Sequence, residues 1–493
     1  MTAPAAPATT RYEAVIGLEI HVQLRTASKM FCGCAADLRD AAPNSRTCPV
    51  CLGLPGSLPV INRRAVELVL ATGLAIGAES PAVTRWERKN YFYPDLPKGY
   101  QISQYALPLT ANGRLTFETS EGPVSVAITR AHLEEDTARL LHTTDPAGRR
   151  ISLVDFNRSG VPLMEIVSEP ELRNAEQARR YAEELRLLLL TIGASDAALE
   201  GGQMRVEANI SLRLVGSTAF GTRVEVKNMN SFRAVERAIG HEVERQARAL
   251  EVGEAVVQET RGWDDTRGVT VRQRVKETSD DYRYFPEPDL PPLTIDRAWL
   301  ADLSARLPEL PAARRERYRE ELGLSAYDAT VIVGDLGATA IFEGALAADP
   351  SLSSKRLANW VIGEYLRLAK QPGTEEPSTE ARADPVQLAD LVRRVEAGEL
   401  SGTNAKEILR RHIAEGRSTA DLVAELGFAQ ISDEAALAAT VDEILAANPS
   451  AVADVQAGKD QAVGYLVGQV MKATRGQANA GIVQRLVRER VAT

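Results

Sequence analysis

The segment Ala14–Leu24 alternates apolar and polar side chains along most of its length. Its apolar residues fall at every second position, whereas Glu19, His21 and Gln23 fall between them. Side chains of a strand point alternately to opposite faces, so the pattern predicts a strand with one buried face. The other face then carries a carboxylate and an imidazole two residues apart, which is an arrangement that can bind a metal ion.

A second acidic cluster, His-Leu-Glu-Glu-Asp at residues 132–136, lies far along the chain. Hard cations such as Mg²⁺ prefer several oxygen ligands, and reactions of ATP require Mg²⁺. The two clusters together favour a phosphoryl-transfer site. The alternative is that both are polar strand faces in contact with water, and the patterns alone leave both interpretations open.

At 493 residues the chain is long enough for two to four domains. No apolar run approaches the roughly 18 to 20 residues of a membrane helix, which predicts a soluble protein. Residues 1–10 are rich in Ala, Pro and Thr but lack the basic start and apolar stretch of a signal peptide. We therefore expect a short disordered leader and a cytoplasmic protein.

The net charge of −9 argues against indiscriminate binding of nucleic acid. The C-terminal stretch Val455–Thr493 is an exception, because it holds six basic residues and two acidic ones. Phosphate backbones respond to the local density of Lys and Arg, so RNA contact is expected here. An ordinary solvated helix face explains the same residues.

All four cysteines lie close together, as Cys32 and Cys34 followed by Cys48 and Cys51. Two tight pairs joined by a short loop can place four thiolates around one Zn²⁺, and a reducing cytoplasm disfavours disulfides. A site closed by four cysteines has no open position for a substrate. The spacing therefore predicts a structural zinc site over residues 32–51.

The sequence pattern of the chain changes near residue 293. Before it, short alternating stretches and a few helices, over Asn62–Ile76 and Ala175–Thr191, predict an α+β domain over residues 11–293. The proline-rich segment Asp281–Pro292 closes this domain, and Ala- and Leu-rich helical sequence follows. We expect a helical domain over residues 294–416 with a mobile polar insert at 371–385, and a helical tail over residues 417–493.

Two further segments of the first domain combine opposite charges. Arg205–Arg213 alternates as sharply as the first strand, and its expected partner Thr222–Lys227 carries Glu225 and Lys227 on one side. Such a mixture suits a nucleotide held by a metal and by cations, and it equally suits a salt-bridged surface. The sequence lacks a P-loop, a dinucleotide-binding glycine motif and a Gly-x-Ser-x-Gly nucleophile elbow.

Several segments, in order along nearly the whole chain, resemble the GatB/GatE family of tRNA-dependent amidotransferase subunits. The resemblance rests on Gly17–Leu24, Cys48–Gly56, Arg88–Gln104, His132–Asp136, Asp155–Pro170, Asp281–Pro286 and Val467–Thr474. It implies an N-terminal cradle similar to the glutamine synthetase/guanidino kinase fold, then a helical domain and a small YqeY-like tail that contacts tRNA.

The resemblance also implies an activity, that of an ATP-dependent carbon–nitrogen ligase with glutamine as amido donor. The side-chain carboxylate of Glu-tRNA(Gln) or Asp-tRNA(Asn) is phosphorylated by ATP with Mg²⁺, and ammonia then displaces the phosphate. The chain has no glutaminase nucleophile of its own. The family obtains ammonia from a separate amidase (A) subunit, so the implied partners are that amidase, a small C subunit, the misacylated tRNA and an aminoacyl-tRNA synthetase.

Carried onto this sequence, the resemblance assigns roles to individual residues. The expected catalytic and magnesium-binding residues are Glu19, His21, Glu134 and Glu135, with Lys89 as a further catalytic residue and Glu207 or Glu225 completing the metal shell. Glu207 stands where the family motif has Asp. Candidates for contact with the nucleotide or the acceptor end are Asp155, Asn157, Arg158, Asn209 and Lys227. The motif holding Lys89, Asn90, Tyr93, Lys98 and Gln101 is expected to border the substrate or an ammonia channel.

Two other functions compete with this assignment. The chain could be a zinc-bearing, tRNA-binding scaffold whose partner performs the chemistry. It could also be a free-standing ligase that acts on small glutamate, although the basic tail argues against that function. Dependence of ATP cleavage on aminoacyl-tRNA separates the three.

Overall fold

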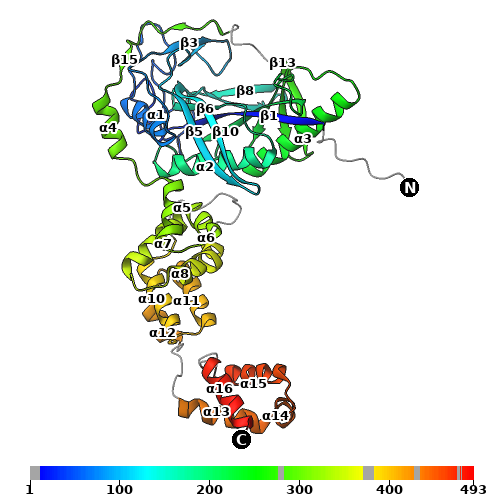
Figure 1. The fold of residues 1–493 in the computed structure, drawn as a ribbon. Coiled ribbons are helices and arrows are strands. Elements are labelled where there is room, and N and C mark those ends of the chain that lie inside the picture. The colour runs from blue at the N-terminus through cyan, green and yellow to red at the C-terminus, as the bar shows by residue number, and fades with distance from the viewer. Residues whose placement is uncertain are drawn as a thin grey trace. The chain divides into compact units, whose positions relative to one another are not determined.

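The computed structural model describes residues 11–275, 282–369, 382–426, 434–474, 478 and 480–492. The chain divides into two compact units, Met1–Leu310 and Pro311–Thr493. The first unit mixes strands and helices and the second is helical, as the sequence predicted (Figure 1). The leader expected over residues 1–10 and most of the insert expected over residues 371–385 lie outside the described residues.

An eight-stranded sheet forms the centre of the first unit. Its strands, in spatial order, are β13 (Val269–Val275), β12 (Glu259–Asp264), β11 (Val224–Met229), β10 (Met204–Leu214), β1 (Tyr12–Gln23), β9 (Pro162–Ser168), β6 (Gly122–Glu135) and β5 (Thr110–Thr119). All neighbours run antiparallel except β11 and β12, which are parallel. The predicted strands at Ala14–Leu24 and Arg205–Arg213 are confirmed as β1 and β10, and β11 is the expected neighbour of β10.

Three helices pack against the apolar side of this sheet: α1 (Arg63–Ala75), α2 (Ala175–Thr191) and α3 (Phe232–Glu251) (Figure 1). Their N-termini are capped by the side chains of Asn62, Asn174 and Ser231. Alternate residues of β1, such as Ile16 and Ile20, are fully buried in the core. Each buried aliphatic side chain contributes about 2 kcal/mol to the free energy of folding. A shift of the β1 register by one residue would expose these side chains and is strongly disfavoured. This register keeps Glu19 and His21 on the face opposite the helices.

Smaller elements complete the first unit. They are a three-stranded sheet of β14 (Phe285–Pro286), β3 (Glu87–Asn90) and β4 (Tyr100–Ser103), a pair of β15 (Leu293–Thr294) and β2 (Val83–Thr84), and the hairpin of β7 (Arg139–Thr144) and β8 (Arg150–Asp155). The helix α4 (Arg297–Ala305) adds Trp299, Leu300 and Leu303 to the main core. The first unit therefore extends past residue 293, where the proline-rich segment placed its end.

The second unit begins with helices that pack on one another: α5 (Pro311–Glu320), α6 (Ala326–Val333), α7 (Leu336–Ala348), α8 (Ser354–Trp360), the π-helix η3 (Val361–Tyr365), α9 (Leu366–Ala369), α10 (Pro385–Glu396), α11 (Gly402–Glu415) and α12 (Thr419–Leu426). The first residue of α12, Thr419, donates its backbone N–H to Gln387 of α10 over 2.7 Å. This helix thus packs with the preceding ones, beyond the boundary expected near residue 417.

The last four helices have a hydrophobic core of their own. They are α13 (Glu434–Ala447), α14 (Pro449–Gln456), α15 (Asp460–Ala473) and α16 (Ala480–Ala492). Leu437, Leu466 and Val487 are among its buried residues.

We find no single helix within the described ranges with the length and hydropathy that crossing a membrane requires. Taken together, α6 and α7 pass the same criterion, and they are bent by 111° at their junction.

Candidate active site

A row of charged residues crosses the polar face of the sheet. In the strand register, His21 of β1 lies opposite Glu165 of β9, and Glu165 lies opposite His132 of β6. On the other side of β1, Arg205 of β10 lies opposite His21, and Glu207 lies opposite Glu19. Strand pairing therefore gathers onto one face residues that are widely separated in the sequence.

His21 is the centre of this row. Its Nε2 atom lies 3.5 Å from Glu165 Oε2, 3.7 Å from Glu134 Oε1 and 3.9 Å from Glu19 Oε1. The structure thus brings together Glu19, His21 and Glu134, which the sequence singled out. It adds Glu165, which sequence reasoning missed, although a lone carboxylate within the apolar run Pro162–Ser168 was a signal that could have found it.

Three sets of ligand atoms on this face lie close enough to share a cation, with all atoms of a set within 4.8 Å of one another. They are Glu19, His21 and Glu165; His132, Glu134 and Glu165; and Glu19, Glu207 and Glu225. The sets are linked, because Glu165 and Glu19 each belong to two of them. We call these seven residues the cation group.

The electrostatics of the cation group favour a bound cation. Burial and the charge of Glu165 raise the pKa of Glu19 to about 7. Burial alone would lower the pKa of His21, but the carboxylates of Glu165 and Glu134 outweigh it and raise that pKa to about 9. Burial lowers the pKa of His132 to about 4, so this imidazole is neutral at pH 7. Carboxylates crowded in a buried place are stabilised by a divalent cation.

The donor set fits magnesium. Five carboxylates supply the oxygen ligands that Mg²⁺ prefers, and imidazole nitrogens are available beside them. Within the part of the chain that the structure describes, the buried Nδ1 atoms of His21 and His132 have no hydrogen-bond partner. Each of these nitrogens can therefore donate a hydrogen bond to a bound group, accept one from it or coordinate it.

Two lysines border the cation group. Lys227 Nζ lies 2.7 Å from Glu207 and 3.8 Å from Glu225. Lys89 Nζ lies 5.1 Å from the centre of the Tyr282 ring. Burial opposes the charge of Lys89, but Glu134 and Glu165 raise its pKa well above the ordinary value, so it stays charged beside them.

Glu135 lies apart from the cation group, contrary to its expected place in the metal shell. Its carboxylate pairs with Lys98 Nζ at 2.5 Å and accepts the backbone N–H of Ile102 over 3.0 Å. Its backbone carbonyl accepts from the Gln101 side chain over 2.7 Å. The reason is the alternation of β6, which sends Glu134 and Glu135 to opposite sides.

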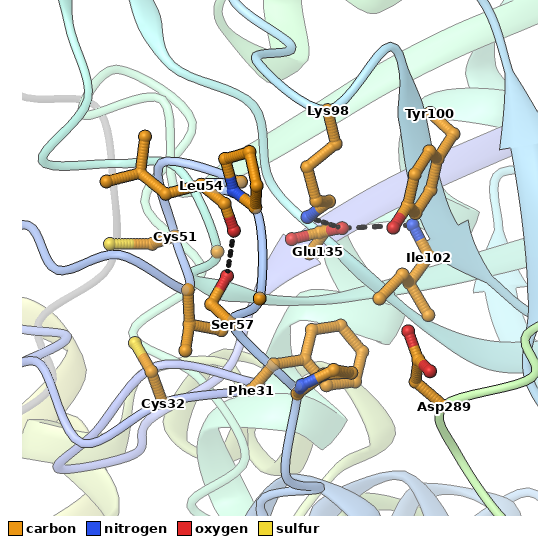
Figure 2. A pocket seen from close by; sticks show the side chains of 16 residues that line it. Phe31, Cys32, Cys51, Leu54, Ser57, Lys98, Tyr100, Ile102, Glu135 and Asp289 are labelled. Carbon is orange, nitrogen blue, oxygen red and sulfur yellow. Dashed lines mark hydrogen bonds and ion pairs between the residues drawn. The ribbon is translucent and has the colours of Figure 1, made fainter.

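Glu135 instead borders a cavity of about 220 Å³ (Figure 2). Lys98, Tyr100 and Ile102 line the same side of it. The other lining residues include Cys32 and Cys51 of the cysteine-bearing loop (residues 32–51) and the flanking Phe31 and Leu54. Sequence reasoning placed Lys98 and Gln101 at the border of a channel, and both contact Glu135 here. Of the same motif, Asn90 donates to the carbonyls of Tyr282 and Arg283, and Tyr93 is exposed.

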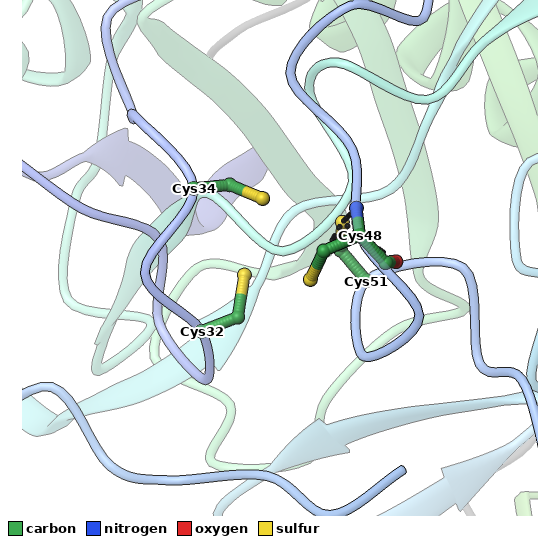
Figure 3. Close-up of side chains that lie close together, drawn as sticks. All are labelled: Cys32, Cys34, Cys48 and Cys51. Carbon is green, nitrogen blue, oxygen red and sulfur yellow. Dashed lines mark hydrogen bonds between the residues drawn. The ribbon is translucent and has the colours of Figure 1, made fainter.

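The four cysteines turn their sulfur atoms toward one another (Figure 3). Their Sγ atoms all lie within 4.8 Å, and those of Cys48 and Cys51 are 3.8 Å apart. None of the four is in a disulfide. The hydrogen bond from Cys32 and, against the effect of burial, the charge of Lys29 help to lower the pKa of Cys51 to about 4. Four converging thiols of this kind fit a structural Zn²⁺.

Asp155, Asn157 and Arg158, which are predicted to contact the nucleotide or the acceptor end, form hydrogen bonds to neighbouring loop segments. Asp155 Oδ1 accepts the backbone N–H of Asn44, and Asn157 accepts that of Arg46. Arg158 donates to the carbonyls of Thr137 and Ala138. The bonds of Asp155 and Asn157 tie the cysteine-bearing loop to the end of β8 and the turn after it, and those of Arg158 tie the same turn to the segment that follows β6. The remaining candidate, Asn209, lies opposite Gly17 of β1 and Glu225 of β11, at the border of the cation group.

Comparisons with known proteins agree with one another. Residues 14–301 match the family model described as the GatB/GatE catalytic domain, and residues 340–491 match the model described as the GatB domain. Proteins named as the B subunit of aspartyl/glutamyl-tRNA(Asn/Gln) amidotransferase are similar over nearly their full length. Those of Thermomicrobium roseum and Moorella thermoacetica are 51% and 50% identical, with 97% of this chain covered in each case and 98% and 100% of the relative. That of Roseiflexus sp. is 49% identical, with 98% of both chains covered.

Proposed function

The chain belongs to the GatB/GatE family, and from this premise we propose that it is the B subunit of an aspartyl/glutamyl-tRNA(Asn/Gln) amidotransferase. In this proposal it phosphorylates the side-chain carboxylate of misacylated tRNA with ATP and then amidates it. The observation that carries the proposal is the cation group, where five carboxylates and two imidazoles from five strands meet on one face of the sheet.

The reaction has two steps. A carboxylate oxygen of the glutamyl or aspartyl side chain attacks the γ-phosphorus of ATP, and the bond from phosphorus to the bridging oxygen breaks, so ADP leaves with the electron pair. The nitrogen of ammonia then attacks the acyl carbon of the acyl phosphate. Phosphate departs with the electron pair of the C–O bond and one proton of ammonia, and the amide remains. Phosphorylation is needed because oxide is too poor a leaving group at neutral pH.

Magnesium, when bound, would neutralise phosphate charge and hold the phosphates in place. We assign it to the cation group, with Glu19, His21 and Glu165 at one position and Glu19, Glu207 and Glu225 at another. Glu134 lies beside the first position, 3.7 Å from His21 Nε2. The charged Lys89 next to Glu134 and Glu165 can orient the attacking carboxylate. Lys227, held by Glu207, balances the charge of the second set. We also assign ATP contact to Asn209 at the border of this group.

Ammonia has to come from elsewhere, because the sequence holds no glutaminase nucleophile. An amidase (A) subunit and a small C subunit are the proposed partners. We propose that ammonia reaches the site through the cavity beside Lys98 and Glu135, which is lined by both polar and apolar residues. An aminoacyl-tRNA synthetase is a further proposed partner, since misacylated tRNA has to be delivered.

The rest of the chain fits this assignment. We propose that the first unit is a cradle of the glutamine synthetase/guanidino kinase type, with a structural zinc in the Cys32–Cys51 loop. Helices α5–α12 form the connecting domain. The YqeY-like helices α13–α16 bind tRNA through basic residues of α15 and α16. The complex acts in the cytoplasm.

The test is reconstitution of the complex with each misacylated tRNA, ATP and glutamine, followed by mass analysis of the released aminoacyl group. We expect Glu or Asp to be converted to the amide, with one ATP cleaved for each amide formed. Cleavage of ATP without aminoacyl-tRNA would instead indicate a free-standing ligase. Binding of tRNA without any ATP cleavage would indicate a scaffold subunit.

A further inference from the structure

Arg205 occupies a distinctive place on the polar face of the sheet. It lies on β10 directly opposite His21 and next but one to Glu207. Its side chain is 37% exposed, although carboxylates surround it. Among the described residues, its one partner within hydrogen-bond distance is Asp136, whose Oδ1 atom lies 3.1 Å from a terminal guanidinium nitrogen. A guanidinium has five N–H donors, so most of them remain available.

The other cations that sequence reasoning placed here are each held by carboxylates or by backbone carbonyls. Lys227 is held by Glu207 and Glu225. Arg158 donates to the backbone carbonyls of Thr137 and Ala138, each over 2.9 Å. Lys89 faces the Tyr282 ring and the carboxylates of Glu134 and Glu165. Arg205 differs from them because it lies directly opposite His21 and, among the described residues, its guanidinium is bonded to Asp136 alone.

Asp136 fixes the position of Arg205. It is buried, and its Oδ2 atom accepts from Gln23 Nε2 over 2.9 Å, while Oδ1 also accepts the backbone N–H of Thr137. Arg158 Nε lies 3.6 Å from Asp136 Oδ2. A carboxylate held by this many partners cannot turn away, so it restrains the guanidinium that it binds.

We propose that Arg205 binds the phosphoryl group that passes from ATP to the aminoacyl carboxylate, and that Asp136 is its positioning residue. This inference rests on the proposed function and adds two residues to it. As the carboxylate oxygen bonds to phosphorus and the bond to the ADP oxygen breaks, negative charge spreads over the three equatorial oxygens. A planar guanidinium donates two parallel N–H bonds to such oxygens and exchanges no proton.

The test uses the reconstituted complex with Arg205→Ala, Arg205→Lys and the control Arg213→Ala. Arg213 lies on the same face of β10 at the far end of the strand, paired with Glu13 at 2.7 Å. We expect R205A to lower kcat for aminoacyl-tRNA-dependent ADP formation about 100-fold, with a smaller change in KM for ATP. R205K should regain only part of the rate, because a lysine ammonium cannot donate two parallel N–H bonds to the phosphoryl oxygens. Added guanidinium ion should restore turnover to R205A, and R213A should behave as the unmodified complex.

A second comparison tests Asp136. We expect Asp136→Asn to slow ADP formation about tenfold and to add little in the R205A background, since residues that act as a unit are not additive. Binding of Mn²⁺, measured by electron paramagnetic resonance, should be unchanged in R205A, which shows that the fold and the cation group are intact.

Two results would overturn the inference: R205A turning over like R213A, or a loss that guanidinium does not restore while Mn²⁺ binding is retained. If the double variant lowered kcat by the product of the two single effects, Asp136 would act independently of Arg205 and would be removed from the proposal. Failure of the proposed function is distinguishable, because the unmodified complex would then cleave no ATP in response to aminoacyl-tRNA.

Discussion

Glu165 of β9 lies 3.5 Å from the Nε2 atom of His21 on the neighbouring strand β1. The same carboxylate oxygen lies 3.5 Å from Nε2 of His132 on β6. Because Glu165 belongs to two of the three sets that can hold a cation, it links the two imidazoles and Glu134 into one group. Loss of Glu165 would therefore affect two of the three sets at once.

Replacing Glu165 with Gln keeps the shape of the side chain and removes its charge. We expect the Mg²⁺ concentration that gives half-maximal ATP cleavage to rise about 10- to 100-fold, because a coordinated carboxylate and its neighbours set metal affinity. The measurement is a Mg²⁺ titration of aminoacyl-tRNA-dependent ADP formation. Glu118→Gln, at an exposed position of β5, is the control. An unchanged titration curve for E165Q would remove this residue from the site.

Replacing Cys48 with Ser should release the zinc ion. The expected result is a fall from about one zinc per chain to nearly none, because three thiolates hold the ion more weakly than four. Unfolding of the variant on heating should begin several degrees lower, since the loop over residues 32–51 has few regular elements. Elemental analysis and calorimetry provide the two readings, with the exposed Ser45→Ala as control. Equal metal content in both variants would argue against a zinc site.

Replacing Glu135 with Gln tests the cavity beside it. The substitution removes the ion pair with Lys98. If ammonia passes here, more glutamine should be hydrolysed for each amide formed, whereas amidation supplied with ammonium chloride should change less. Glutamate release and amide formation are measured side by side, again with E118Q as control. Equal loss with both nitrogen donors would instead place Glu135 in the phosphorylation step.

Removing residues 434–493 deletes the four helices that share a separate core. We expect tRNA affinity to fall at least about tenfold, because several phosphate contacts are lost with the basic residues. Glutaminase activity of the partner, measured without tRNA, should be retained. Equal losses of tRNA binding and glutaminase activity would mean that the helices support assembly of the complex.

The sequence was informative where apolar residues recurred with the period of a strand (two residues) or of a helix (3.6 residues) and are buried in the structure. The strand at Ala14–Leu24 and the helices α1 and α2 were predicted for that reason, because a slip would expose apolar side chains. The ends of the domains were less predictable. Proline density marked the segment before Leu293, but α4 still contributes apolar residues to the first core.

Within the site, pairing across strands decided what sequence spacing could not. Glu134 and Glu135 are adjacent in sequence, yet they face different partners because β6 alternates. Glu165 was missed because its strand reads as an apolar run, and its meaning depends on the register with β1 and β6. Asp155 and Asn157 are conspicuous polar residues, but they bond to the backbone of Asn44 and Arg46.

The central claim is that the cation group enables transfer of phosphate to an aminoacyl carboxylate. Its most direct test is hydroxylamine trapping of the acyl phosphate on Glu-tRNA(Gln) without glutamine, in the unmodified complex and in Glu19→Gln. We predict hydroxamate formation that requires ATP and Mg²⁺, and a loss of about 100-fold or more in E19Q at unchanged tRNA binding. Hydroxamate formation by E19Q at the unmodified rate would contradict the account.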